Sequence, residues 1–382
     1  MKWEKVKLIN CCNSLTDGDH QAPPKSSDGV PFVTISNIIN NQFDFDNTMF
    51  VPYEYYENLD EKRKPRKNDI LYSVVGSYGI PVLIKNNSPF VFQRHIAILK
   101  PKEEVNAKFL YYTMLSNEFY VKADNVALGA AQRTISLTAL RNIEINVPDI
   151  EVQHKIANIL SAYDDLIENN QKQIKLLEEA AQRLYKEWFV DLRFPGYEDI
   201  PIINGMPEGW EEEEINKIFN IKYGKTLPTN KIKNSGKYPV YGANGIIGYY
   251  NQKNCNDYVV LITSRGNGSG EVSRTHDKEA FVTNNSFIIM PVNDLIKLPF
   301  TYQLMKTINF KRICTGSAQP QLTNKSINIL KVVLPSDELV LKFCQYTEIY
   351  YEKIENLLSQ NKRLIEARDR LLTKLMSGEI EV

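Results

Sequence analysis

Basic residues gather in one polar stretch of the sequence, and their spacing suggests contact with phosphate groups. The stretch reads EKRKPRKND and contains Lys62, Arg63, Lys64, Arg66 and Lys67. A cluster of this kind can neutralise several phosphates of a nucleic acid and release the counterions around them. A solvated surface loop explains the same composition equally well, so both interpretations stay open at this point.

Two glycine loops lie near side chains that can read the edges of bases. The loops, Gly76–Gly79 and Gly266–Gly270, interrupt the strand-like runs NDILYSVVGSYGIPVLI and NDYVVLITSRGNGSGEV. Arginine can donate two hydrogen bonds to guanine, and asparagine or glutamine can bind adenine through two hydrogen bonds. The candidate DNA-binding residues in and around the loops are Ser77, Tyr78, Arg94, Arg133, Ser264, Arg265, Asn267, Asn284 and Asn285.

Gln132 and Gln319 are further candidates for contact with DNA. Each belongs to a Gly-x-Ala-Gln motif, one beginning at Gly129 and the other at Gly316. A glutamine that satisfies backbone groups explains this identity at least as well, because identical side chains cannot read different base sequences. Both interpretations of the two glutamines are kept.

The sequence lacks the motifs of the common catalytic and cofactor sites. The run GNGSG is not followed by the Lys-Ser/Thr of a P-loop, and it lacks the spacing of a dinucleotide fingerprint. A structural turn is therefore the better interpretation of it. No HExxH, GxSxG or CxxC motif occurs, and no Asn/Asp-Pro-Pro-aromatic motif of an adenine methyltransferase is present. We predict no catalytic residue and no metal ligand.

Length and charge restrict the classes of protein to be considered. A chain of 382 residues is longer than one core usually serves, so more than one domain is expected. A formal net charge of zero argues against indiscriminate coating of nucleic acid, but it allows a locally basic face. Neither a signal peptide nor an apolar run of about 20 residues is evident, so we expect a cytoplasmic protein without a membrane span.

The elements that would position these residues occur twice. GAAQRTISLTALRNIEINVP begins at Gly129 and GSAQPQLTNKSINILKVVLP at Gly316, an offset of 187 positions (316 minus 129). The same offset continues without a gap and pairs Ile167-Glu168-Asn169 with Ile354-Glu355-Asn356. This period is too long for a solenoid repeat. It indicates a duplicated unit of one domain followed by one helix.

Each copy of the motif is followed by a segment with strong helical periodicity. Apolar residues recur at alternating steps of four and three positions from Ile156 to Trp188 and from Phe343 to Leu375. This is the 3.5-residue period of a coiled-coil seam. We predict that the two helices bury these stripes against each other, with Asn170 and Asn361 fixing the register. The alternative is that each helix packs separately on its own domain.

Taken together, these features resemble the specificity (S) subunit of type I restriction-modification systems. The resemblance covers essentially the whole chain and rests on the domain opening PEGWEEEEINKIF, the paired Gly-x-Ala-Gln segments, the two helices and the tail RLLTKLMSGEI. It implies an α+β fold, in which two mixed α/β target recognition domains are joined by two long antiparallel coiled-coil helices in an internal pseudo-two-fold repeat. The expected boundaries are 1–148 for the first recognition domain, 149–195 for the first helix, 196–335 for the connector and second domain, and 336–382 for the second helix.

The resemblance also implies a function. Each domain would read one half of an asymmetric, bipartite site in double-stranded DNA, and the chain itself would be non-catalytic and bind no cofactor. Two methyltransferase (M) subunits would bring S-adenosylmethionine, and restriction (R) subunits would bring ATP- and Mg-dependent cleavage. A fused methyltransferase or nuclease is a rival hypothesis, which the missing motifs disfavour. A purely structural coiled-coil protein is another, but it would leave two β-rich domains unexplained.

Overall fold

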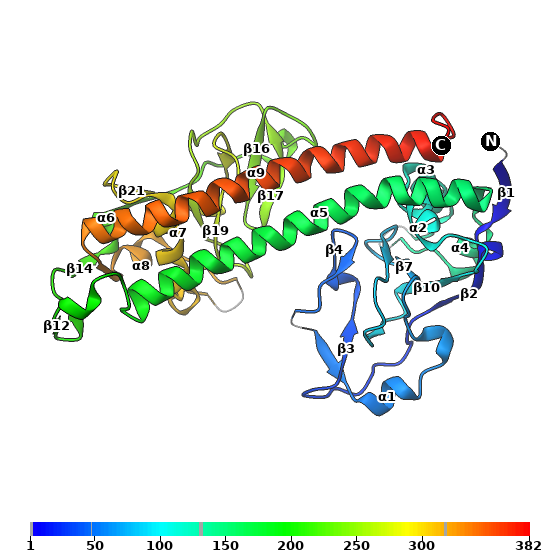
Figure 1. The fold of residues 1–382 in the computed structure, drawn as a ribbon, viewed down its shortest axis with the longest axis horizontal. Coiled ribbons are helices and arrows are strands. Elements are labelled where there is room, and N and C mark those ends of the chain that lie inside the picture. Colours follow the sequence, from blue (N-terminus) through cyan, green and yellow to red (C-terminus); the bar gives the residue numbers. More distant parts are fainter. Residues whose placement is uncertain (1–2, 47, 130–132, 317–318) are drawn as a thin grey trace. The chain divides into compact units, whose positions relative to one another are not determined.

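The computed structural model describes residues 3–46, 48–129, 133–316 and 319–382. These residues form two compact units (Figure 1). The first unit comprises Met1–Glu168 and Lys362–Val382, and the second comprises Asn169–Asn361. Each unit therefore joins a β-rich domain to one part of each of two long helices.

The first unit is built around a four-stranded antiparallel sheet with strand order β2–β10–β7–β8. Its central strand β7 reads ILYS, and all of its residues are buried because structure covers both faces. Helices α2 and α3 pack against the sheet. The bounds are β2 Cys12–Asp17, β7 Ile70–Ser73, β8 Pro81–Leu83, β10 Ile96–Pro101, α2 Ala107–Leu115 and α3 Asn117–Val126.

Smaller elements complete the first unit. A second sheet has the order β6–β3–β9, in which β3 and β9 are parallel, and the N-terminal strand β1 pairs with β11. The bounds are β1 Trp3–Lys7, β3 Val30–Val33, β4 Ile38–Ile39, β5 Gln42–Phe43, β6 Met49–Val51, α1 Tyr53–Glu57, β9 Val91–Phe92, α4 Leu137–Asn142 and β11 Glu144–Pro148.

The second unit repeats this topology. The order β15–β21–β18–β19 matches the four-stranded sheet of the first unit, and β17–β16–β20 matches the smaller sheet, including one parallel pair. Strands β14 and β22 pair as β1 and β11 do. The bounds are β12 Ile202–Ile203, β13 Met206–Pro207, β14 Glu211–Glu214, α6 Ile215–Ile218, β15 Phe219–Tyr223, β16 Tyr238–Gly242, β17 Gly245–Tyr250, β18 Val260–Thr263, β19 Val272–Arg274, β20 Phe281–Val282, β21 Ser286–Pro291, α7 Leu298–Thr307, α8 Asn324–Asn328 and β22 Lys331–Leu334.

Two long helices follow the repeated strands β11 and β22. Helix α5 spans Ile150–Tyr185 and continues into a π-helical turn at Lys186–Val190, and α9 spans Asp337–Met376. With 36 residues, α5 is about 54 Å long at 1.5 Å per residue. Asp337 and Glu338 lie in the first turn of α9, where negative charge complements the helix dipole.

The helices pack antiparallel within each unit. In the first unit, Ile156 and Leu160 near the start of α5 share a buried cluster with Leu372 and Leu375 near the end of α9. Arg368 reinforces this contact, because its Nη1 donates to Oδ1 of Asp164 at 2.7 Å.

In the second unit, the end of α5 meets the start of α9. The ring centroids of Tyr185 and Phe343 lie 5.7 Å apart, and those of Trp188 and Phe343 lie 6.0 Å apart. The buried amide of Asn170 donates to Oδ1 of Asn361 at 2.9 Å, so the polar positions in the two apolar stripes satisfy each other. The predicted fold class and the antiparallel pairing are confirmed, whereas the exact domain boundaries stay predictions. None of the helices formed by the described residues has the length and apolar character needed to cross a membrane.

The ion pair between the helices leads to a prediction about stability. We expect Arg368→Ala to lower the free energy of unfolding of the first unit by about 1–3 kcal/mol, because it leaves the half-buried Asp164 without its charged partner. The matched control is Arg183→Ala on the exposed face of α5, which breaks a looser pair with Glu179 and should cost about 0.5 kcal/mol or less. Urea unfolding of the three proteins measures both changes. Equal, small effects of the two substitutions would show that the Asp164–Arg368 pair does not hold the helices together.

Candidate nucleic-acid interface

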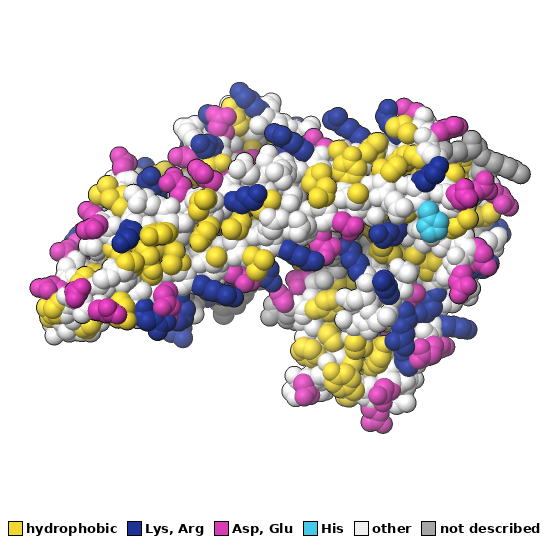
Figure 2. Space-filling model, viewed as in Figure 1, with side chains coloured by type: hydrophobic (Ala, Val, Ile, Leu, Met, Phe, Trp, Pro, Cys, Tyr) yellow, Lys and Arg dark blue, Asp and Glu magenta, His cyan; other side chains and the backbone are white. Residues whose placement is uncertain are grey.

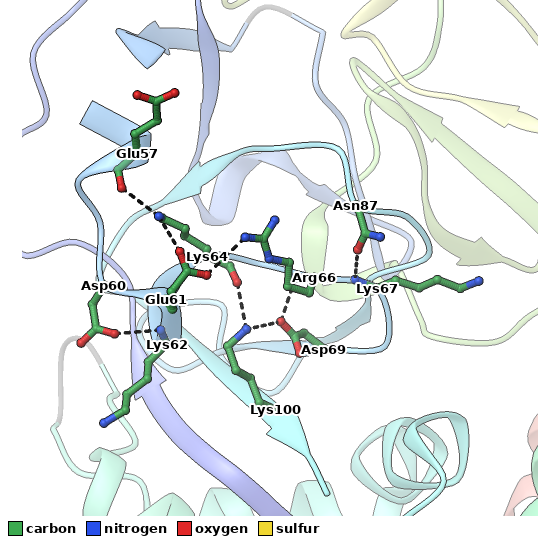
Figure 3. Close-up of polar contacts among 10 residues, drawn as sticks. All are labelled: Glu57, Asp60, Glu61, Lys62, Lys64, Arg66, Lys67, Asp69, Asn87 and Lys100. Atoms are coloured by element: carbon green, nitrogen blue, oxygen red, sulfur yellow. Dashed lines mark hydrogen bonds and ion pairs between the residues drawn. The ribbon is translucent and has the colours of Figure 1, made fainter. Parts of the chain in front are cut away.

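The predicted basic cluster lies between α1 and β7 in the first unit (Figure 3). Its first residues form a short 3-10 turn, Glu61–Arg63, capped by Oδ1 of Asp60, which accepts the backbone N–H of Lys62 at 2.9 Å. At the other end, Oδ2 of Asp69 accepts the backbone N–H of Arg66 and the ammonium of Lys100. Acidic side chains thus fix the backbone that carries the basic ones.

Lys64 differs from its neighbours in the cluster. Its side chain is turned inward and the residue is only 7% exposed. Its Nζ donates to the backbone oxygen of Glu57 at 2.8 Å and to Oε1 of Glu61 at 2.6 Å. Separating a buried charge from its partners costs free energy. Lys64 therefore stabilises the packing of α1 against the 3-10 turn. The expectation that Lys64 contacts phosphate does not fit this position.

The two arginines of the cluster are held more loosely. Arg66 donates to Oε2 of Glu61 at 3.2 Å, and Nη2 of Arg63 lies 3.8 Å from Oδ1 of Asp17. Hydrogen bonds from Lys64 and Arg66 lower the pKa of Glu61, so this carboxylate stays ionised. Surface ion pairs of this type contribute little free energy. The arginines can therefore exchange their carboxylate partners for phosphates at low cost.

Lys62 and Lys67 carry the free cations of the cluster. Their ammonium groups point away from the acidic side chains, as Figure 3 shows, and neither forms an ion pair or hydrogen bond with another described residue. The backbone of Lys67 is nevertheless fixed, because its N–H donates to Oδ1 of Asn87 at 2.8 Å. Figure 2 shows Lys and Arg side chains gathered on this part of the first unit, close to α1. These two lysines are the best placed to contact phosphate.

The first glycine loop is tied to α3 through an aromatic and charged network. Tyr78 stacks on Tyr120 with ring centroids 6.2 Å apart, and its hydroxyl donates to Asp124. This hydrogen bond raises the pKa of Tyr78 to about 12. Arg133 donates to Oδ1 of Asp124 at 2.6 Å and lies over the ring of Tyr78. Ser77, at the tip of the loop, is exposed. Sequence reasoning found Tyr78 and Arg133, but it missed Tyr120 and Asp124, which position them.

The remaining candidate of the first unit lies apart from this network. Arg94 is exposed in the turn between β9 and β10, and its backbone N–H donates to the oxygen of Asp19 at 2.9 Å. Its guanidinium has no hydrogen bond or ion pair with another residue in the described part of the chain. Gln132 lies outside the described residues.

In the second unit the structure separates the candidates into buried and exposed groups. Ser264 is fully buried, and its Oγ donates to the backbone oxygen of Asn284 at 3.3 Å. Its backbone N–H donates to the oxygen of Asn285. The expected contact of Ser264 with DNA does not fit, because this residue joins β18 to the half-buried turn at Asn284 and Asn285. Arg265 and Asn267, by contrast, are exposed at the surface.

The residue that follows each Gly-x-Ala-Gln motif holds the glycine loop of its unit. The backbone N–H of Gly76 donates to the oxygen of Arg133 at 3.2 Å, and that of Gly266 donates to the oxygen of Pro320 at 3.1 Å. Arg133 and Pro320 are equivalent in the repeat, since they lie 187 positions apart (320 minus 133). The adjacent Gln319 is exposed. The shared segment therefore serves as a backbone support for two loops whose own residues differ.

Among the described residues, no cluster of three or more His, Cys, Asp or Glu side chains is arranged to bind a metal ion. Burial raises the pKa of Cys11 and that of Cys255 to about 11, so both thiols stay protonated near neutral pH. The described loops offer hydrogen-bond donors, acceptors and positive charge on a backbone that is held by hydrogen bonds.

Comparison with known proteins gives a consistent family assignment. Residues 2–179 and 207–358 match the family described as the type I restriction modification DNA specificity domain. The MjaIX specificity subunit of Methanocaldococcus jannaschii is 26% identical over 340 residues, which cover 83% of this chain and 78% of the relative. The HindI specificity subunit of Haemophilus influenzae is 23% identical over 99% of both chains. The crystal structure of the type I system S subunit from M. genitalium shares the fold, with a TM-score of 0.58, 22% identity and coverage of 98% of this chain and 96% of that one.

The environments of the lysines lead to a prediction about binding. Replacing both Lys62 and Lys67 by Ala should weaken binding to DNA of every sequence and flatten its salt dependence, by about one unit of slope for each phosphate that is no longer neutralised. Lys64→Met is the matched control, because the buried ammonium of Lys64 is already paired. It should lower stability and leave the salt slope unchanged. Binding measured from low to high salt, with the chain in complex with its partners, separates the two cases. An unchanged slope in the double variant would remove this cluster from the DNA interface.

Proposed function

Because this chain belongs to the type I restriction-modification DNA specificity family, we propose that it selects the DNA sequence on which a larger complex acts. The observation that supports this most directly is the duplication of a domain together with its glycine loop. Two domains of the same topology each present a glycine loop on the same backbone support. Positioning by phosphate contacts and reading by base contacts are separate tasks: the basic cluster of the first unit suits the former, and the exposed loop residues of both units suit the latter.

The differences between the loops support an asymmetric, bipartite target. The first loop presents Ser77 with the tethered pair Tyr78 and Arg133, whereas the second presents Arg265 and Asn267. Side chains that differ in donors and acceptors select different base edges. The two units would therefore read two different half-sites. The long paired helices would set the number of base pairs between those half-sites.

We assign the chemistry to partner subunits. Methylation of a base in duplex DNA requires extrusion of that base into a pocket beside the methyl donor. The sequence carries no Asn/Asp-Pro-Pro-aromatic motif of an adenine methyltransferase. Two M subunits would bring S-adenosylmethionine, and R subunits would bring ATP and Mg for cleavage of unmodified DNA. The chain would be the non-catalytic scaffold of this complex, acting in the cytoplasm where the DNA is.

A domain exchange tests this proposal. Residues 1–128 are replaced by the equivalent part of another type I specificity subunit of known target, and everything from Gly129 onward is kept. The original and exchanged chains are each expressed with the M subunits, and methylated adenines are mapped by sequencing. We expect one half-site to change while the other half-site and the gap stay the same. The purified chain alone is the control and should methylate nothing. A change in both half-sites together, or turnover by the chain alone, would contradict the proposal.

A further inference from the structure

A hollow of about 440 Å³ on the second unit is lined by polar groups that have few partners. It lies between the turn from β16 to β17 and the loop from β18 to β19, with Asn244, Arg265, Asn267 and Glu271 in its walls. The side chains of Asn244, Arg265 and Asn267 form no hydrogen bond or ion pair with another described residue. Their hydrogen-bonding groups are therefore available to a ligand.

Hydrogen bonds to backbone oxygens hold the walls of this hollow. Oγ of Ser269 donates to the oxygen of Pro320 at 2.6 Å, and the N–H of Gly270 donates to the oxygen of Thr263 at 2.8 Å. Oγ1 of Thr263 donates to the oxygen of Ala243 at 2.9 Å, which ties the loop to the β16–β17 turn. A ligand that binds here does not have to order the loop first, so less affinity is lost to conformational entropy.

Acceptor oxygens converge on one side of Gly268. A Cβ added at Gly268 would lie 3.2 Å from Oε2 of Glu271 and 3.6 Å from Oδ1 of Asn244. Glu271 is exposed, and its other oxygen, Oε1, faces Nζ of Lys311 at 3.3 Å. Oε2 has no hydrogen-bond partner among the residues that the structure describes. The hollow thus combines a free guanidinium from Arg265 with a free carboxylate oxygen.

This combination of charges favours the edge of a base pair over a phosphate. A phosphate offers only acceptors, and a carboxylate beside it would repel it. A G·C pair in the major groove offers acceptors on N7 and O6 of guanine and a donor on N4 of cytosine. An arginine can donate to N7 and O6 of the guanine, and a glutamate oxygen can accept from N4 of the cytosine.

We propose that Arg265 and Glu271 together read a single G·C base pair in the half-site of the second unit. The inference rests on the function proposed above. Arg265 donates to N7 and O6 of the guanine, and Oε2 of Glu271 accepts from N4 of the cytosine. A thymine in place of the cytosine would set its O4, an acceptor, against the carboxylate. The two side chains therefore select a G·C pair both by attraction to it and by repulsion of an A·T pair.

Two single variants and their double variant test this assignment in the complex with M subunits. Arg265→Ala and Glu271→Ala should each relax the same position of the second half-site and leave the first half-site unchanged. In binding assays with duplexes that carry each of the four base pairs at that position, the preference for G·C should fall about 10- to 100-fold. The double variant should relax that same position and no other, because both side chains read one base pair.

Glu213→Ala is the matched control, because Glu213 is also a surface glutamate paired with a lysine in the same unit. It should leave the methylated motif unchanged. The inference is overturned if Glu271→Ala methylates the original motif unaltered, if the two variants relax different positions, or if Glu271→Ala abolishes methylation of every sequence. These outcomes differ from failure of the proposed function, in which the complex containing the unaltered chain would show no sequence-specific methylation at all.

Discussion

Helices α5 and α9 each carry one apolar stripe that water would wet unless the other helix covered it, and the rest of the chain is organised around this pairing. Because the helices run antiparallel, the start of α5 packs with the end of α9, and the end of α5 with the start of α9. Each compact unit therefore needs segments that are far apart in the sequence. The last residues of the chain, Lys362–Val382, belong to the same unit as the first domain for this reason.

The repeat extends to the way in which each domain is fastened to its helix. Glu168 on α5 and Glu355 on α9 are equivalent positions, 187 residues apart (355 minus 168). Glu168 forms an ion pair with Lys85, just beyond β8, and Glu355 forms one with Arg274 at the end of β19. The same edge of the sheet thus meets the same point of the following helix in both units. The ion pair of Glu355 is more deeply buried than that of Glu168. We therefore expect the loss of one partner to cost more free energy of unfolding in the second unit than in the first.

Sequence patterns predicted the frame of this protein better than the state of its individual side chains. The repeat, the 3.5-residue stripes and the glycine loops are each visible in the order of residue types along the chain, and all of them correspond to elements of the structure. Lys62 and Lys64 are indistinguishable by composition, yet one is exposed and the other is buried against Glu57 and Glu61. Ser264 is buried because the turn at 284–285 packs on it, a contact across 20 positions. Asp124 and Glu271 were missed because their roles arise from neighbours that only folding brings close.

Lengthening both helices tests most directly whether the helix pair sets the distance between two half-sites that the two domains recognise independently. One heptad is inserted in α5 after Lys175 and one in α9 after Asn356, which lies near the opposite position because Asn170 faces Asn361. Each insertion adds about 10 Å by helix rise and keeps the apolar stripe in phase. At about 3.4 Å per base pair, the methylated motif should keep both half-sites and gain up to roughly three base pairs between them. A motif whose gap stays the same while methylation persists, or one whose half-sites change, would contradict the account.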